Sequence, residues 1–306
     1  MTERKISRAV VTGPTGAIGT ALCRALAEKG ITVFAVCRPN SQRSGQVPEH
    51  RNIRKVFCDL SELNRLPQLI DGADAFYHFG WAHTIGSGRN DMPAQISNIS
   101  YTIDAVQAAS ALSCQVFIGA GSQAEYGRVE GALQPNTPCN PENGYGIAKL
   151  CAGQMSRIEC AKQGLDHVWV RILSVYGPND NPASMIPGVI RQLRQGEVPK
   201  LTAGEQKWDY LYAADAADAF CRVALHGISG KTYVLGSGSA KPLKEYVCAL
   251  RDAINPKLEL GFGQVPYGLN QVMFLQADIS ELTRDTGFVP QTDFAQGIRN
   301  TIKETL

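Results

Sequence analysis

The fold of this chain follows from one stretch near its start, Thr12-Gly13-Pro14-Thr15-Gly16-Ala17-Ile18-Gly19. It comes directly after an apolar run, Ile6 to Thr12, that predicts a buried strand, and it opens a segment, Ala17 to Lys29, that predicts a helix. Glycines at such a turn let the backbone bend sharply and approach a ligand closely. The free N–H groups and positive dipole end of the helix attract phosphate. We therefore expect this turn to cradle a pyrophosphate.

Short apolar runs alternate with longer helical patterns throughout the first half of the chain. Parallel strands joined by crossover helices produce this alternation. The expected strands are Ile6–Thr12, Ile31–Cys37, Ile53–Cys58, Ala75–Phe79, Val116–Ala120 and His167–Leu173. We predict an α/β fold built on a doubly wound, Rossmann-like parallel sheet.

The pattern changes at Gly177-Pro178-Asn179-Asp180-Asn181-Pro182, where turn residues are too dense for a strand or helix to continue. A helix near Met185 to Gln195 follows, then an apolar stretch, 210–225. We expect residues 1–176 to form a nucleotide-binding domain to which residues 209–236 return. Residues 177–208 and 237–306 then form a smaller C-terminal substrate-binding lobe.

Composition limits the partners of this 306-residue chain. The 30 basic and 28 acidic residues form no basic run, which argues against binding of nucleic acid or of an anionic membrane surface. No apolar run is long enough to cross a bilayer, and the first residues are too polar for a secretory signal. Nine scattered cysteines without a C-x-x-C pair indicate free thiols and no metal site. We expect a cytoplasmic protein with a small-molecule partner.

Three residues form the candidate catalytic set: Ser122, Tyr145 and Lys149. Tyr145 and Lys149 are four residues apart in a helical stretch, so their side chains lie on one helix face. A nearby ammonium favours the phenolate, which lets a tyrosine exchange a proton with a substrate oxygen. Ser122 follows the fifth expected strand, from where it can hydrogen-bond the same oxygen. Lys149 can also hold the nicotinamide ribose.

The G-x-x-G-x-x-G spacing at Gly13, Gly16 and Gly19, followed by Ser122 and the Y-x-x-x-K pair, resembles the extended short-chain dehydrogenase/reductases. Within them it is similar to the nucleotide-sugar epimerase/dehydratase group over the first 176 residues. The resemblance implies an NAD(P)-dependent enzyme acting on a nucleotide-linked sugar. It thins beyond that point, where Trp208 begins a segment similar to the family's R-D-F-x-x-V-x-D and replaces its arginine.

The residue after the second expected strand separates the two cofactors, because an acid there binds ribose hydroxyls and repels a 2'-phosphate. Arg38 stands at this place and offers a guanidinium suited to phosphate, with Asn40 and Ser41 close by. We therefore expect NADP(H), with NAD(H) the weaker alternative. The resemblance adds an adenine contact and a loop passing over the cofactor. The expected cofactor-binding residues are Gly13, Thr15, Gly16, Ala17, Ile18, Gly19, Arg38, Asn40, Ser41, Asp59, Leu60, Phe79, Gly80, Trp81, Tyr145 and Lys149.

The residues after Ser122 narrow the reaction. Family members that eliminate water carry an Asp-Glu pair there, whereas this chain has Gln123 and Ala124. A related epimerisation uses a cysteine in the place of Ala124. Glu125 comes one position late, and we expect it to point away from the site. Three hypotheses remain open: NADPH-dependent reduction of a 4-keto (6-deoxy) sugar, NAD(P)-dependent 4-epimerisation, and a catalytically silent NADP(H) sensor. The resemblance leaves a further enzyme alternative, an aldehyde or flavanone-type reductase whose substrate carries no nucleotide.

The substrate-binding candidates are His83, Asn98, Gln123, Ser174, Arg191 and Trp208. Ser174 stands where many nucleotide-sugar enzymes carry an asparagine. Family members commonly pair through the helix carrying the catalytic tyrosine and the helix before it. We therefore expect a homodimer, with Ile99, Ile103 and Val106 on one helix and Leu150 and Met155 on the other as candidate contacts.

Overall fold

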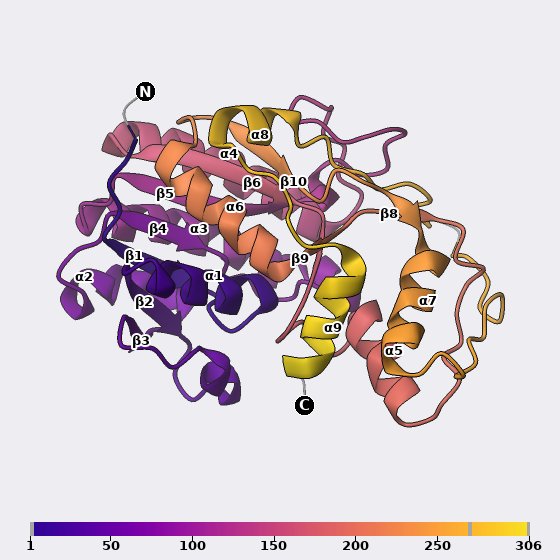
Figure 1. Ribbon diagram of the computed structural model, residues 1–306. Coiled ribbons are helices and arrows are strands. Elements are labelled where there is room, and N and C mark those ends of the chain that lie inside the picture. Colours follow the sequence, from indigo (N-terminus) through magenta and orange to yellow (C-terminus); the bar gives the residue numbers. More distant parts are fainter. Residues whose placement is uncertain (1–2, 269–270, 305–306) are drawn as a thin grey trace.

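A computed structural model of the chain describes residues 3–268 and 271–304. Its centre is a parallel sheet of seven strands in the order β10-β6-β5-β4-β1-β2-β3 (Figure 1). These strands are β1 (Arg8–Thr12), β2 (Thr32–Cys37), β3 (Ile53–Phe57), β4 (Ala75–His78), β5 (Val116–Ser122), β6 (Asp166–Ile172) and β10 (Thr232–Leu235). The predicted α/β, doubly wound architecture is confirmed. The outermost residues of the expected domains, 1–2 and 305–306, lie outside the described residues.

All six strands expected from the sequence are present, with ends shifted by one or two residues. The seventh, β10, falls within the stretch 209–236 that we expected to return to the sheet, and it pairs in parallel with β6. The apolar stretch 210–225 divides into a short strand, β9 (Tyr210–Tyr212), and a helix, α6 (Ala213–His226). Strands β1 and β4 are almost entirely buried because helices cover both faces of the sheet.

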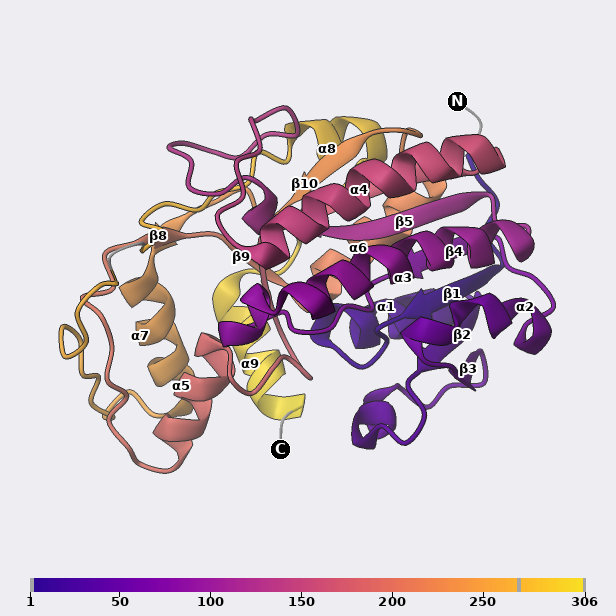
Figure 2. The same ribbon diagram turned by 180° about the vertical axis from the view of Figure 1, so that it is seen from behind.

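Two helical layers enclose the sheet. Helices α1 (Ala17–Glu28) and α6 pack together on one face, in front of the sheet in Figure 1. Helices α3 (Met92–Ala111) and α4 (Gly144–Gln163) pack together on the other face, in front in Figure 2, with the short α2 (Leu66–Leu69) beside them. Each layer has its own apolar core against the sheet.

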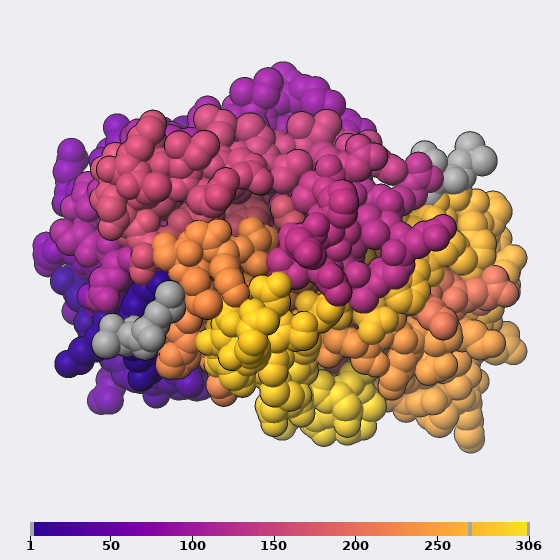
Figure 3. Space-filling model, turned by 90° about the horizontal axis from the view of Figure 1, so that it is seen from above, coloured from indigo at the N-terminus to yellow at the C-terminus, as the bar shows by residue number. Residues whose placement is uncertain are grey.

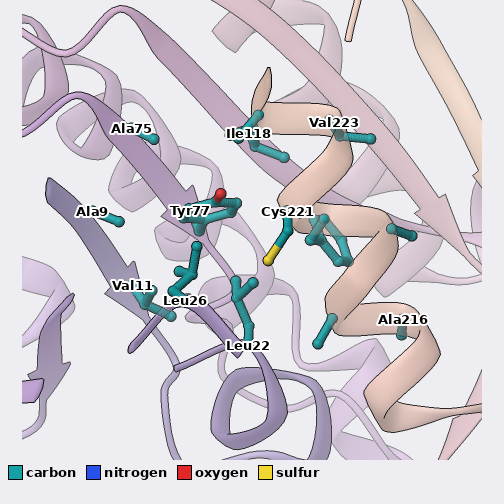
Figure 4. Packing of buried hydrophobic residues seen from close by; sticks show 14 of the residues in the cluster. Ala9, Val11, Leu22, Leu26, Ala75, Tyr77, Ile118, Ala216, Cys221 and Val223 are labelled. Carbon is teal, nitrogen blue, oxygen red and sulfur yellow. The ribbon is translucent and has the colours of Figure 1, made fainter. Parts of the chain in front are cut away.

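The core under α1 and α6 shows how the sequence fixes this packing. Leu22 and Leu26 of α1 point toward Tyr77 of β4, and Cys221 of α6 approaches the same ring (Figure 4). All four side chains are at most 3% exposed. Burial of these side chains against one another holds α1, and with it the glycine turn before it, onto the sheet.

A second group of elements lies beside the carboxyl edge of the sheet. Helices α5 (Met185–Arg194), α7 (Leu243–Ile254) and α9 (Phe294–Glu304) share one apolar cluster, whereas α8 (Ser280–Thr286) packs against α6 and β10. The minor strand pairs are β7 (Ser174–Tyr176) with β9, and β8 (Lys207–Trp208) with β11 (Lys241–Pro242). The 3-10 turns are η1 (Gln42–Gln46), η2 (Leu60–Arg65), η3 (Gly86–Asn90) and η4 (Gln123–Glu125).

The segment between η4 and α4 reaches across to this second group. Leu133 forms a β-bridge with Ala277, and the Gln134 side chain donates to Asp278 at 2.9 Å. Figure 3 shows the magenta chain of this region lying directly against the yellow C-terminal chain. The two parts of the molecule are therefore joined by direct contacts at the edge where the strands end.

The strand order places a crevice at this edge. Strand β1 lies between β2 and β4, so the connections that leave β1 and β4 run to opposite faces of the sheet. Ligands of such sheets bind where the strand order reverses, beyond the carboxyl ends of the strands. Thr12, His78 and Gly119 are aligned at this level of the sheet.

The packing in Figure 4 yields a stability prediction. Leu22→Ala removes a fully buried side chain from the α1 core and should lower the free energy of unfolding by about 2–5 kcal/mol. Leu69→Ala is the matched control, because Leu69 is 46% exposed and should change the value by at most about 0.5 kcal/mol. Urea unfolding of both variants measures the difference, and equal losses would contradict the assigned core.

Candidate active site

A cavity of about 320 Å³ opens at the carboxyl edge of the sheet. The glycine turn forms one side, and the ends of β4, β5 and β6 form the floor. The residues around it are Gly13, Gly16, Ala17, Ile18, Gly19, Phe79, Trp81, Thr84, Ala120, Gly121, Ser122, Tyr145, Lys149, Ile172, Leu173, Val175 and Asp180. The structure thus brings the three candidate catalytic residues and most of the glycine turn together around one space.

The glycine turn is pressed against the chain that follows β4. Gly13 has φ +67°, and a Cβ there would lie 2.8 Å from the Phe79 carbonyl carbon. A Cβ on Gly16, in contrast, would have no atom within 4 Å, so this glycine faces open space. Helix α1 begins at the next residue, with its first N–H groups at the same end. The turn therefore has the shape and the donors of a phosphate cradle.

Ser122 is fixed at the end of β5 by a reciprocal hydrogen-bond pair. Its Oγ accepts the N–H of Ala124 at 3.2 Å, and the Glu125 carboxylate accepts the N–H of Ser122 at 2.8 Å. The same carboxylate accepts from Trp169 Nε1 at 3.0 Å and Arg171 Nε at 2.6 Å. Glu125 is fully buried and its carboxylate lies against β6, which confirms that it points away from the cavity.

Helix α4 begins beside Ser122. Its N-cap, Asn143, accepts the N–H of Gly146 at 2.9 Å. A Cβ on Gly146 would lie 2.3 Å from the Ala124 carbonyl oxygen, so only glycine permits this close approach of the helix to the turn after β5. This approach sets Tyr145 next to Ser122 on the wall of the same cavity.

Lys149 occupies the inner side of the same helix turn. Its Nζ donates to the Ala120 carbonyl oxygen at 2.6 Å and lies 3.7 Å from the centre of the Trp81 ring. The Trp81 and Tyr145 rings meet edge to face with centroids 6.1 Å apart. The ammonium is 5.9 Å from the centre of the Tyr145 ring. Lys149 thus contacts the tryptophan more closely than the tyrosine.

Burial dominates the titration of these groups. It raises the pKa of Tyr145, whereas the hydrogen bond with Ser122 and the charge of Arg89 lower that pKa in part. Burial lowers the pKa of Lys149 to about 7, against the opposing charge of Glu125. Burial therefore moves the two pKa values apart, that of Tyr145 upward and that of Lys149 downward, and perturbed pKa values of this kind are common at functional sites.

The other expected cofactor-binding residues lie in the glycine turn and just after the ends of β2, β3 and β4. Arg38 and Asn40 are exposed after β2, and Ser41 leads into η1. Asp59 accepts the N–H of Ser61 at 3.0 Å and starts η2. The remaining members follow the strand ends: Thr15 in the glycine turn, Leu60 against Gly80, and Phe79 and Gly80 after β4.

The substrate-binding candidates occupy different surroundings. Ser174 and Trp208 contact each other, with the indole N–H donating to Ser174 Oγ at 2.7 Å. The buried Asn98 amide bonds both backbone groups of Ala82 at 3.0 Å, and His83 is exposed. Arg191 lies in a separate cavity of about 400 Å³. Gln123 is half-buried beside Ser122.

Three residues at the site were not singled out from the sequence. Asp180 lines the cavity, and burial raises its pKa to about 6 against hydrogen bonds from Asn181 and Ser184. Arg43 donates to the carbonyl oxygens of Thr15 and Asn179 at 3.0 and 3.1 Å. The Arg89 guanidinium lies over the Tyr145 ring. The turn at 177–182 was the available signal for Asp180, and it indicated only a change of domain.

Residues 3–268 and 271–304 contain no cluster of three or more potential metal ligands, and none of their helices has the length and apolar character needed to span a membrane. The nine cysteines are free thiols.

Comparison with known proteins agrees with this geometry. Residues 9–236 match the model of the NAD dependent epimerase/dehydratase family. An uncharacterized UDP-glucose epimerase of Bacillus subtilis (strain 168), YtcB, is 26% identical over 308 residues, which cover 96% of both chains.

Two solved structures show the same fold. The UDP-N-acetylglucosamine 4-epimerase of Methanobrevibacter ruminantium M1, in complex with UDP-N-acetylmuramic acid, superposes with a TM-score of 0.89 at 23% identity over 99% of both chains. The UDP-glucuronic acid 4-epimerase of Bacillus cereus, in complex with NAD, gives 0.84 at 20% identity over 97% of this chain and 98% of that one. Because the family model covers most of the chain and includes the glycine turn and the catalytic set, this protein is an enzyme of the NAD dependent epimerase/dehydratase family, within the extended short-chain dehydrogenase/reductases.

Proposed function

We propose that this enzyme is an NADPH-dependent reductase of a nucleotide-linked 4-keto (6-deoxy) sugar. The observation that carries this proposal is the set of residues that line one cavity. Ser122, Tyr145 and Lys149 line it together with the glycine turn, whereas the residues after Ser122 supply no free carboxylate. Such a site is equipped for hydride transfer coupled to proton transfer at one oxygen.

A dinucleotide fits the cavity as the structure has it. The open space at Gly16 and the N–H groups at the start of α1 suit a pyrophosphate, and Lys149 lies deeper in the same cavity, where a ribose would be held. Arg38, Asn40 and Ser41 would hold the 2'-phosphate. When bound, the nicotinamide supplies the hydride that reduces the ketone.

The proton comes from the chain itself. Tyr145 donates its phenolic proton to the substrate oxygen while that oxygen gains negative charge, and Ser122 hydrogen-bonds the same oxygen. Lys149 has a pKa of about 7, so near neutral pH it exists in both forms and can return a proton to Tyr145. The net reaction consumes one hydride and one proton for each ketone.

Water elimination is disfavoured by the surroundings of Ser122. Elimination from a sugar needs an acid and a base beside the reacting carbons. Gln123 and Ala124 are not ionisable, and the carboxylate of Glu125 is buried and occupied by Trp169 and Arg171. This argues for a redox reaction without dehydration.

The second candidate is 4-epimerisation through a transient ketone, which the same three residues can catalyse. The similarity to two proteins described as 4-epimerases and one as a UDP-glucose epimerase favours it. Arg38 favours the reductase, because a net reductase draws on NADPH whereas an epimerase recycles its NAD. Measurement of NADPH consumption with a 4-keto sugar nucleotide decides between them.

The remaining expectations complete the proposal. Residues 1–176 and 209–236 would bind the cofactor, and 177–208 and 237–306 would bind the substrate, with Ser174 and Trp208 facing it as an uncharged pair joined by a hydrogen bond. His83, Asn98, Gln123 and Arg191 stay substrate-binding predictions. The free cysteine thiols support the proposal of a cytoplasmic enzyme, with neither nucleic acid nor a membrane as partner.

We further propose a homodimer formed by the outer faces of α3 and α4, which are in front in Figure 2. Ile96 on α3 and Ile147 and Ile158 on α4 are 64%, 54% and 56% exposed. Of the contacts expected from the sequence, Met155 is exposed and Ile99, Ile103 and Leu150 are half-buried, whereas Val106 is fully buried in the core. Exposed isoleucines along two neighbouring helices are typical of a protein interface.

The dimer proposal predicts twice the chain mass in light scattering at micromolar concentration. Ile96→Glu combined with Ile158→Glu should give the mass of one chain, because two carboxylates would be buried without partners. Phe57→Glu is the control, since Phe57 is 56% exposed on β3 at the far edge of the sheet and should leave the mass unchanged. A single-chain mass for the unaltered protein contradicts the proposal.

The catalytic set predicts the effect of Tyr145→Phe. The ring and its packing against Trp81 stay, so NADPH binding should persist, while turnover falls by about 10²- to 10⁴-fold because the proton donor is lost. Tyr101→Phe on α3 serves as control and should leave turnover unchanged. NADPH oxidation at 340 nm measures both. Full activity of Tyr145→Phe refutes the relay. A sensor is favoured if the unaltered protein neither oxidises NADPH with a 4-keto sugar nucleotide nor epimerises a sugar nucleotide.

The cofactor proposal predicts a reversal in Arg38→Asp. The unaltered protein should bind NADPH more tightly than NADH by about 1.5–3 kcal/mol for each charge-assisted hydrogen bond to the phosphate. Arg38→Asp should bind NADH more tightly, because a carboxylate repels the phosphate and accepts from the ribose hydroxyls. Arg54→Asp makes the same charge change at an exposed residue of β3 and should keep the preference for NADPH. Calorimetry showing equal affinities in the unaltered protein contradicts the proposal.

A further inference from the structure

Arg89 is a charged residue of the active site that the catalytic set does not include. It lies in η3, the turn before α3, and its guanidinium carbon is 4.9 Å from the centre of the Tyr145 ring. The turn is fastened to the start of α4, because Asn90 Oδ1 accepts the N–H of Gly144 at 2.9 Å. Gln95 of α3 holds it from the other side by donating to the Gly88 carbonyl oxygen at 3.1 Å. The contact between Arg89 and Tyr145 is therefore set by the fold.

The guanidinium of Arg89 is not used elsewhere in the described part of the chain. Its Nε is buried without a hydrogen-bond partner, and no carboxylate among residues 3–268 and 271–304 forms an ion pair with it. The other charges near the site are engaged, since Glu125 pairs with Arg171 and Lys149 donates to the Ala120 carbonyl oxygen. Arg89 thus presents an uncompensated positive charge to the face of the Tyr145 ring.

Arginine and lysine side chains also differ in the pH range over which they stay charged, and this distinguishes Arg89 from Lys149. Burial lowers the pKa of Lys149 to about 7, so this side chain loses its charge as the pH rises through neutrality. A guanidinium stays protonated over the whole range in which a tyrosine titrates. Lys149 is, in addition, farther from the Tyr145 ring, at 5.9 Å from its centre. The Arg89 guanidinium is therefore the nearer of the two cationic groups to the centre of this ring.

We propose that Arg89 is a positioning residue for Tyr145, whose guanidinium over the ring stabilises the phenolate that forms when the proton leaves. A cation over an aromatic face is attracted to the ring electrons, and more strongly when the ring carries a full negative charge. The effect makes Tyr145 a stronger acid toward the substrate oxygen. The inference rests on the proposed function in one respect, the assignment of Tyr145 as proton donor.

The groups that face Tyr145 agree with this assignment. Ser122 and Glu125 approach from β5 and η4, Arg89 from η3, and Lys149 from the same helix. Burial raises the pKa of Tyr145, the Ser122 hydrogen bond and Arg89 lower it, and Glu125 raises it. Arg89 therefore opposes the two influences that would keep the phenol protonated.

The test follows the titration of Tyr145 itself, without substrate. The protein is labelled with ¹³C at the tyrosine ζ carbon, and the Tyr145 signal is identified by its loss in Tyr145→Phe. As the pH rises, the signal of the unaltered protein should begin to move toward its phenolate position. In Arg89→Gln this movement should begin about one pH unit higher, because one charge near the ring has been removed. Arg89→Lys keeps the charge and should titrate close to the unaltered protein.

Two further variants keep the test decisive. Arg157→Met removes an arginine from α4 that hydrogen-bonds Gln154, and it should leave the Tyr145 titration unchanged. Arg89→Met is a second neutral variant in case Arg89→Gln does not fold. If a folded neutral variant titrates at the same pH as the unaltered protein, the inference is overturned. A purely structural role for Arg89 predicts lost stability and no change in the Tyr145 titration. A shifted titration in a folded neutral variant therefore also excludes that role.

Activity provides a separate readout. Reduction needs protonated Tyr145, so turnover should fall as the pH rises through the pKa of this residue. A raised pKa in Arg89→Gln should move that basic limb to higher pH, and Arg157→Met should not move it. If the unaltered protein shows no NADPH turnover, the proposed reductase function is wrong. The shift of the Tyr145 signal still tests the role of Arg89 in that case.

Discussion

The close approach of two chain segments at the carboxyl edge of the sheet is the constraint on which the site depends. The glycine turn after β1 touches the backbone after β4, and at Gly13 even a methyl group would collide with Phe79. Thr12 joins the same segments, because its Oγ1 accepts the N–H of Gly80 at 3.0 Å and lies 3.0 Å from His78 Nδ1. Burial lowers the pKa of His78 to about 3, so this histidine stays neutral and acts as a hydrogen-bonding support.

A second contact of the same kind positions the candidate catalytic residues. Gly146 lets the start of α4 lie against the turn after β5, and this brings a helix residue, Tyr145, beside a strand-end residue, Ser122. At both contacts, a Cβ on the glycine would collide with backbone atoms of the neighbouring segment. Both are maintained by the helical layers, whose burial against the sheet supplies the stabilisation that such tight turns need.

Two buried charges beneath this site, Glu125 and Arg171, compensate each other. Glu125 and Arg171 form an ion pair with side chains 0% and 7% exposed, and the carboxylate also receives the Trp169 indole and the Ser122 N–H. Burial opposes the charge of Arg171, yet the Glu125 carboxylate raises the pKa of this guanidinium above its usual value. Removal of one partner would leave the other charge buried and unpaired, which proteins seldom tolerate. The network thereby keeps the acid of η4 out of the cavity and the serine in place.

The sequence by itself determined the layered fold and the chemistry-bearing residues. Strand and helix periods, the glycine turn and the Y-x-x-x-K spacing are local signals, so they identified the six strands and the set that lines the cavity. The family resemblance added that Gln123 and Ala124 stand where water-eliminating members carry an acid pair. Local signals could not show that the Asn98 amide hydrogen-bonds the backbone of Ala82. Nor could they show that Ser174 and Trp208, which stand where family members carry an asparagine and an arginine, hydrogen-bond each other.

Only the tertiary structure decided which charges meet Tyr145. The chain places Lys149 four residues from Tyr145, but its ammonium lies on the Trp81 ring, while Arg89, 56 positions away in sequence, lies on the tyrosine. Asp180 likewise enters the cavity from a turn whose composition signals only a break in regular structure. The physical reason is that side-chain spacing along a helix fixes a face, whereas the partner on that face comes from whichever distant segment the fold packs against it.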